Sequence, residues 1–124
     1  MFVAKGHEIL EEHDPNGIDA HTPGAKLDSG KPNCDLVFGG FANALLEVAK
    51  VGTFGATKYT PQGWKSVPNG VERYRSAAYR HLLTSKLIDE DSGLPHLAMA
   101  AWNCLAALEL IMSTTYPLGG EPNE

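Results

Sequence analysis

The sequence is short of cysteine, of basic residues and of long apolar runs, and each shortage argues against a class of protein. Its 124 residues include 2 cysteines, Cys34 and Cys104, which lack the spacing of metal ligands. The formal net charge of -5 argues against nucleic acid as a partner, because phosphate backbones attract an excess of Lys and Arg. No apolar run approaches the roughly 20 residues of a membrane span. The first residues lack the layout of a signal peptide, so we expect reduced thiols in a cytoplasmic protein.

The composition is that of a folded globular chain, with 43% hydrophobic and 20% charged residues. Its length fits a single domain over residues 1–124. Frequent Pro and Gly predict an irregular arm over residues 1–34, and residues 119–124 are expected to be a frayed tail.

The remaining pattern predicts three main helices. Apolar residues recur three and four apart over residues 35–58, although the Gly39-Gly40 pair moves the firm start to about Gly40. A loop follows, and a second helix is expected over residues 70–87 with Asn69 as its N-cap. The third helix is expected to run to Thr114. Asp91 or Ser92 would cap it, with Pro95 in the first turn.

The third predicted helix is apolar on nearly every face, which indicates burial on several sides and a partner subunit. The sequence therefore predicts an all-α fold. It is a helical bundle of three main helices with a non-helical N-terminal arm, assembled as a homo-oligomer.

Polar residues form a stripe on the first helix. Glu47, Lys50, Phe54 and Lys58 lie at i, i+3, i+7 and i+11, which is one helical face. A carboxylate and two ammonium groups beside the small Gly55 suit a metal–phosphate ligand. Alternatively, Glu47 and Lys50 form an exposed pair at the edge of the core.

The second helix carries an Arg-His pair on an otherwise mixed face. Arg80 has the planar fork that binds phosphate through two parallel hydrogen bonds, and His81 can orient water or ligate a metal. The alternative is a surface arginine beside a core histidine whose hydrogen bonds are satisfied.

An acidic turn, residues 88–93, joins the second helix to the third. It carries three acids, Asp89, Glu90 and Asp91, which repel one another unless water solvates them or a cation neutralises them. Mg²⁺ prefers such oxygen ligands. Helix capping is the alternative, but capping needs one acid, not three.

On the third helix, His96 and Asn103 share a face two turns apart. Together with the acids they favour a site, whereas a lone His on an apolar helix is more often structural.

Two motifs are dismissed. The segment GAKLDSGK (24–31) has one residue too many for a phosphate loop and is followed by Pro32 where Ser or Thr is needed, although Lys26 and Lys31 can still contact phosphate. His13-Asp14 resembles the dipeptide of metal phosphohydrolases but lies in the irregular arm.

Four ordered segments resemble one known family. They are GAKLDSGKPNCDL, ALLEVAKVGTFGATKYTPQGWKSV, RYRSAAYRHL and DEDSGLPHLAMAAWNCLAALEL. Over roughly residues 24–110 the chain resembles the phage dATP/dGTP diphosphohydrolases called MazZ, which are similar to the wider MazG-like all-α nucleotide pyrophosphohydrolases. The resemblance implies a helical oligomer, with a tetramer favoured over a dimer. It also implies Mg²⁺ held by acidic side chains, with Mn²⁺ as a substitute, and cleavage between the α and β phosphates.

The resemblance also implies roles for individual residues. We expect Glu47, Asp89 and Asp91 to bind metal, and Glu47, His81 and Asp91 to serve catalysis. The substrate, a purine deoxynucleoside triphosphate, would contact residues from the arm and all three helices: Lys26, Lys31, Lys58, Trp64, Arg80, His96 and Asn103. Asp28 is implicated through the arm motif.

The chain departs from the family pattern in three places. Ser85-Lys86 replaces Gly-Glu, Asp91 replaces Glu, and Met99 replaces a frequent His, so Met99 is left out of the site.

The expected reaction is hydrolysis of dGTP, and of GTP and dATP, to the monophosphate and pyrophosphate. The resemblance adds a supply of dGMP for 2-aminoadenine nucleotides in a phage. Two alternatives remain open: a house-cleaning enzyme for damaged nucleotides, and a non-enzymatic helical dimerisation module.

Overall fold

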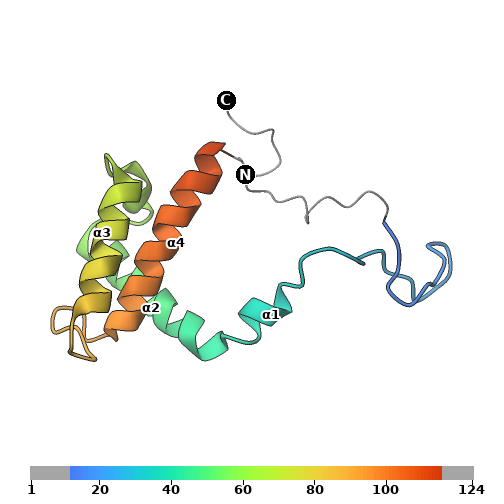
Figure 1. Ribbon diagram of the computed structural model, residues 1–124, viewed down its shortest axis with the longest axis horizontal. Coiled ribbons are helices and arrows are strands. Elements are labelled where there is room, and N and C mark those ends of the chain that lie inside the picture. Colours follow the sequence, from blue (N-terminus) through green and yellow to red (C-terminus); the bar gives the residue numbers. More distant parts are fainter. Residues whose placement is uncertain (1–11, 116–124) are drawn as a thin grey trace. The chain divides into compact units, whose positions relative to one another are not determined.

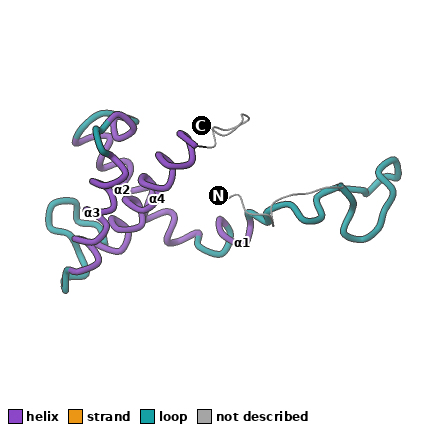
Figure 2. Tube along the Cα trace, turned by 45° about the horizontal axis from the view of Figure 1, so that its top comes forward, coloured by secondary structure: helices purple, strands orange, loops and turns teal. Residues whose placement is uncertain are grey.

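A computed structural model describes residues 12–115 of the chain. It contains α1 (Asp35–Phe38), α2 (Ala42–Lys58), the 3-10 helix η2 (Gly63–Ser66), α3 (Gly70–Leu83) and α4 (His96–Thr115) (Figure 1). Over this part of the chain there is no strand, only an isolated bridge between Ile88 and Pro95, and Figure 2 shows helices and loops alone. The all-α prediction is confirmed.

The chain divides into two compact units, Met1–Gly40 and Phe41–Glu124. Within the second unit, α4 packs chiefly against α3 and also against α2 and η2. Figure 1 shows α3 and α4 side by side. The buried side chains at these contacts are mostly small, so the helices approach closely. They are Val51, Ala78, Ala98, Ala100, Ala106 and Ala107.

An aromatic cluster joins η2 to the two long helices. The Trp64, Tyr74 and Trp102 rings meet edge to face, with centroids 5.6 to 6.3 Å apart. The Tyr74 hydroxyl donates to the Trp64 carbonyl at 2.8 Å. Burial raises the pKa of the Tyr74 phenol, which keeps it a hydrogen-bond donor at neutral pH.

The first predicted helix is divided at the glycine pair. The four residues of α1 end at Phe38, and α2 begins at Ala42, close to the predicted firm start. Glycine costs helix stability because its unfolded backbone has more freedom to lose. The Gly39-Gly40 pair therefore marks the break that the sequence suggested.

Asn69 occupies the predicted N-cap position of α3, whereas the cap predicted for α4 was wrong. Asn69 precedes α3 in the left-handed conformation, with a φ of 55°, and makes no capping bond with its side chain. Neither Asp91 nor Ser92 caps α4, because its first turn begins further along. The carbonyl of Pro95 accepts the N–H groups of Ala98 and Met99.

The second predicted helix also ends early, at Leu83 and not at Leu87. Residues 87–96 turn back on themselves: the Asp89 N–H donates to the Leu94 carbonyl at 2.8 Å and the His96 N–H to the Leu87 carbonyl at 2.9 Å. These bonds take the backbone groups that a longer helix needs.

The expectation that no apolar run is long enough to span a membrane was wrong for α4. By length and composition His96–Thr114 passes that test, with a mean hydropathy of 1.4. Core helices of soluble proteins also pass it, and α4 carries four of the five buried alanines and the buried Asn103. The predicted tail, 119–124, lies outside the described residues.

Candidate functional site

Two predicted site residues from distant parts of the chain lie in direct contact. The Lys58 ammonium, at the end of α2, donates to Asp91 Oδ2 in the acidic turn at 2.9 Å. This hydrogen bond and the charge of Asp91 raise the pKa of Lys58, so the ammonium is held in its charged form. Both side chains remain about half exposed, which keeps them accessible to a ligand.

Glu47 pairs with its own helix neighbour. Its carboxylate lies 2.6 Å from the Lys50 ammonium, three residues along α2. Eleven residues separate Glu47 from Lys58, about 16 Å along a helix axis, so one chain does not gather Glu47 with the acidic turn. Across residues 12–115, no three His, Cys, Asp or Glu side chains are arranged to hold a metal.

Each acid of the turn has a partner. Asp89 Oδ2 accepts the Ser92 hydroxyl at 2.7 Å and the Ser92 N–H at 2.9 Å, and Glu90 pairs with Lys86 at 2.7 Å. Burial acts to raise the pKa of Asp89, but the two bonds from Ser92, together with the nearby His96 and His81, hold the pKa below its usual value. Asp89 is therefore a carboxylate at neutral pH.

His81 and His96 form a pair across the junction of α3 and α4. Their Nδ1 atoms lie 2.8 Å apart, so one ring donates a hydrogen to the other. Burial lowers the pKa of His81, and the neighbouring His96 and Arg80 lower it further, while Asp89 acts in the opposite direction. The lowered pKa favours the neutral imidazole of His81 at physiological pH.

The other residues of this unit that were predicted to bind substrate differ in exposure. Arg80 is exposed and donates to the Ser76 hydroxyl at 3.1 Å, so its fork faces solvent. Asn103 is buried, and its amide donates to the Met99 carbonyl of the same helix at 2.9 Å. Trp64 belongs to the aromatic cluster, with the Lys65 ammonium over its ring.

The lysines of the arm, Lys26 and Lys31, lie in the first unit, Met1–Gly40. The Lys26 side chain is exposed, and the Lys31 ammonium lies 3.4 Å from a Glu12 carboxylate oxygen. Asp28 contributes backbone bonds to this segment: its N–H donates to the Lys26 carbonyl, and its carbonyl accepts the Lys31 N–H.

Sequence reasoning missed two residues that organise these segments. Ser92 fixes Asp89, and the Asp-x-x-Ser spacing was a readable signal, since a short acid commonly accepts the N–H groups that follow it. Asp14 accepts backbone hydrogen bonds from two sides of the arm. No local sequence pattern predicts its bond from the Lys26 N–H, twelve residues away.

Both cysteines are free and exposed thiols.

The chain matches the family described as dATP/dGTP diphosphohydrolase, N-terminal, over residues 21–116, and it belongs to that family. The match supports a diphosphohydrolase that acts on purine deoxynucleoside triphosphates. Among curated proteins and among solved structures, none showed significant similarity to this chain.

Proposed function

We propose that this protein hydrolyses dGTP, with GTP and dATP as further substrates, to the nucleoside monophosphate and pyrophosphate. Family membership gives the class of reaction. The observation that carries the assignment of residues is the contact of Lys58 with Asp91, which brings a phosphate-binding cation to a carboxylate of the acidic turn.

A divalent cation fits the acidic turn in part. Mg²⁺ usually takes one or two protein carboxylates together with substrate phosphates, and not a cage of protein ligands alone. Asp89 and Asp91 supply two ionisable oxygen donors two residues apart, whereas Glu47 lies elsewhere on α2 within one chain. We propose that these three residues hold Mg²⁺, or Mn²⁺, with Glu47 acting at an assembled site. The bound ion would supply charge neutralisation and a more acidic water.

The cationic side chains have the chemistry to bind the triphosphate. Lys58 can exchange the Asp91 carboxylate for a phosphate oxygen, because an exposed ion pair is weakly held. The exposed Arg80 fork suits two oxygens of the leaving pyrophosphate, where charge develops during the reaction. We propose that Lys26 and Lys31 also meet phosphate, and that Trp64 and Asn103 contact the nucleoside.

The histidine pair has the chemistry to transfer a proton. Because the two Nδ1 atoms share one hydrogen, protonation of one ring can be relayed to the other. We propose that His81 accepts a proton from the attacking water and that His96 orients it and contacts substrate.

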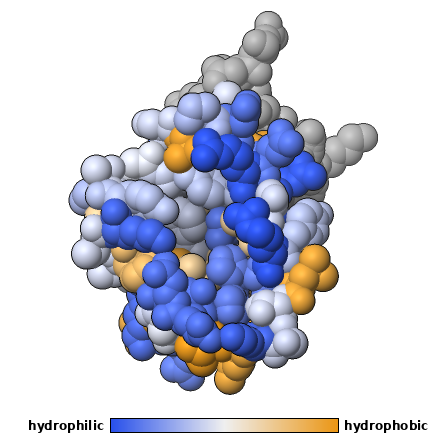
Figure 3. All heavy atoms as spheres, turned by 90° about the vertical axis from the view of Figure 1, so that its left-hand side faces the viewer, coloured by the Kyte–Doolittle hydropathy of each residue, from blue (hydrophilic) through white to orange (hydrophobic). Residues whose placement is uncertain are grey.

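The protein is proposed to act as a homo-oligomer, with a tetramer favoured over a dimer. Many large apolar side chains are exposed in the single chain, and Figure 3 shows hydrophobic patches between hydrophilic ones on one face. One face of α4 carries a stripe of apolar side chains that recur alternately four and three residues apart, the pattern of a coiled-coil seam. The α4 stripe consists of Leu97, Ala101, Cys104, Leu108 and Ile111.

The test of the activity is product analysis. After incubation with dGTP and Mg²⁺, we expect dGMP and pyrophosphate; orthophosphate with dGDP, or no turnover, would refute the proposal. A panel that includes oxidised and deaminated nucleotides separates this activity from house-cleaning, which predicts faster turnover of the damaged substrates. No binding of dGTP with Mn²⁺ in a melting assay would instead favour a non-enzymatic dimerisation module.

On the resemblance alone, we place the dGMP product in the synthesis of 2-aminoadenine nucleotides of a phage, in its host's cytoplasm.

A further inference from the structure

The arm contains a buried acidic side chain that binds the backbone on both sides of a loop. Asp14 is only 5% exposed. Its Oδ1 accepts the N–H groups of Asn16 at 2.7 Å and Ile18 at 3.4 Å, and its Oδ2 accepts the N–H of Lys26 at 2.8 Å. A carboxylate that accepts several backbone bonds orders a segment that has no helix of its own.

Further contacts close the same loop. The Ser29 N–H donates to the His13 carbonyl at 3.1 Å, and the Lys31 ammonium lies 3.4 Å from Glu12. Residues 12–14 therefore run beside residues 26–31, and we name residues 12–31 the arm loop. Gly17 and Gly24 have φ values of 77° and 98°, which let the backbone turn between these two sides.

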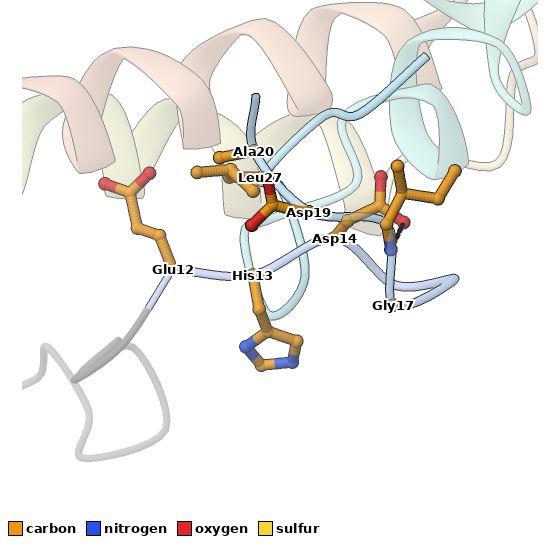
Figure 4. A pocket seen from close by; sticks show the side chains of 8 residues that line it. Glu12, His13, Asp14, Gly17, Asp19, Ala20 and Leu27 are labelled. Atoms are coloured by element: carbon orange, nitrogen blue, oxygen red, sulfur yellow. Dashed lines mark hydrogen bonds between the residues drawn. The ribbon is translucent and has the colours of Figure 1, made fainter. Parts of the chain in front are cut away.

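The acids near Asp14 do not form a metal site. Figure 4 shows that the His13 ring points away from Asp14 and that the carboxylates of Glu12 and Asp19 do not converge on it. Within residues 12–115 no group of three such side chains can hold a metal. The bonds of Asp14 run to the backbone, so its role is to fix the course of the loop.

The loop end that Asp14 holds carries the lysines proposed to bind phosphate. Lys26 is bound through its N–H while its side chain is exposed. The Lys31 ammonium is paired with Glu12, but both side chains are about half exposed, and such pairs are easily exchanged. A loop ordered before binding loses less conformational entropy when it meets a ligand.

We propose that Asp14 is a positioning residue, which pre-orders the arm loop so that Lys26 and Lys31 bind the phosphates of the nucleotide. This inference rests on the proposed function, because that function assigns phosphate binding to the lysines. It adds a residue that lies outside the lysine motif and touches no substrate itself.

The titration of Asp14 agrees with this geometry. The bond from the Lys26 N–H lowers the pKa of the Asp14 carboxyl, and the bonds from Asn16 and Ile18 and the nearby His13 act in the same direction against the effect of burial. Asp14 is therefore a carboxylate at neutral pH.

The experiment compares Asp14→Asn with Asp19→Asn in the full chain. Asn keeps one acceptor but places an amide where Oδ2 receives the Lys26 N–H. Asp19 is a matched control, because it is an exposed acid of the same loop that accepts a single local N–H, from His21 at 3.1 Å. For dGTP we expect Asp14→Asn to raise KM about tenfold, the scale of one lost charge-assisted hydrogen bond, with kcat changed less than about twofold. Asp19→Asn is expected to leave both unchanged.

A mutant cycle separates positioning from general stability. If Asp14 acts through the two lysines, Asp14→Asn should add little to KM once Lys26→Ala and Lys31→Ala are both present, whereas a purely structural defect would add fully. Direct titration with inorganic triphosphate should show the same loss of affinity in Asp14→Asn. An unchanged KM and affinity, full additivity, or loss of the helical circular dichroism signal would each overturn the inference.

Failure of the proposed function gives a different result. If the affinity for inorganic triphosphate depends on Asp14 and on the two lysines but the wild-type protein leaves dGTP intact, the activity is refuted and the positioning role is retained.

Discussion

At the scale of single residues, several charged groups in the described part of the chain form ion pairs. Glu47 is held by Lys50, Asp91 by Lys58 and Glu90 by Lys86, and all these pairs are at least partly exposed. Exposed pairs contribute little to stability, so their partners can be exchanged at low cost. These pairs hold cations against carboxylates, and we propose that a nucleotide and a metal ion separate them on binding.

Glu47→Ala is expected to abolish turnover of dGTP, because it removes a proposed metal ligand, while the helical content stays the same. The measurement is product formation beside circular dichroism at 222 nm. Glu109→Ala, which removes an exposed acid from α4, serves as the control and should keep full activity. Normal turnover by Glu47→Ala would remove Glu47 from the site.

The His81 pair predicts a loss of stability on mild acidification. Burial and the neighbouring His96 and Arg80 lower the pKa of His81 below its ordinary 6.5, against the opposing effect of Asp89. Between 6.5 and that lower pKa the unfolded chain binds a proton that the folded chain does not, so the free energy of unfolding falls as pH drops below about 6.5.

Urea denaturation at pH 7.5, 6.5 and 5.5 measures this effect. The free energy of unfolding should depend less steeply on pH in His81→Gln, because glutamine keeps a polar side chain but does not titrate. An equal slope in both proteins would show that other groups are responsible.

At the scale of elements, the backbone conformation of a glycine decides the effect of a substitution where space for a side chain is free. A Cβ at Gly55 in α2 or at Gly93 in the acidic turn would meet nothing within 4 Å. Their conformations differ, because Gly55 is helical while Gly93 has a φ of 74°, the left-handed region that other residues enter at a cost.

Gly55→Ala should therefore raise the free energy of unfolding by about 0.5–1 kcal/mol, by removing backbone freedom from the unfolded chain. Gly93→Ala should lower it by about 1 kcal/mol, since alanine must adopt a positive φ. Thermal or urea denaturation of the two variants checks the signs. The same sign for both would contradict this account.

At the scale of the whole molecule, α4 leaves several large apolar side chains exposed to solvent. Leu97, Leu108 and Ile111 of the α4 stripe are 67%, 53% and 44% exposed, although α4 also supplies most of the buried alanines. Burying them against a second copy would remove apolar area from water, the main favourable term in association.

Leu108→Lys is expected to shift the protein to a smaller species, because it places a charge in the α4 stripe. Sedimentation velocity measures the shift. Glu109→Lys is the matched control, since it adds the same side chain at a neighbouring exposed position off the stripe. A wild-type monomer, or equal sedimentation of both variants, would contradict the proposed assembly.

The sequence by itself determined the helical class, the break at Gly39-Gly40 and the family, because periodicity, glycine punctuation and ordered motifs are local signals. Only the tertiary structure decided which polar groups meet. The Lys58 contact with Asp91 and the His81 pair with His96 depend on how α2, α3 and α4 pack. The cap predicted at Asp91 was wrong for the same reason: backbone bonds across residues 87–96 outcompeted the local preference. Packing brings together residues far apart in sequence, and no local pattern records those contacts.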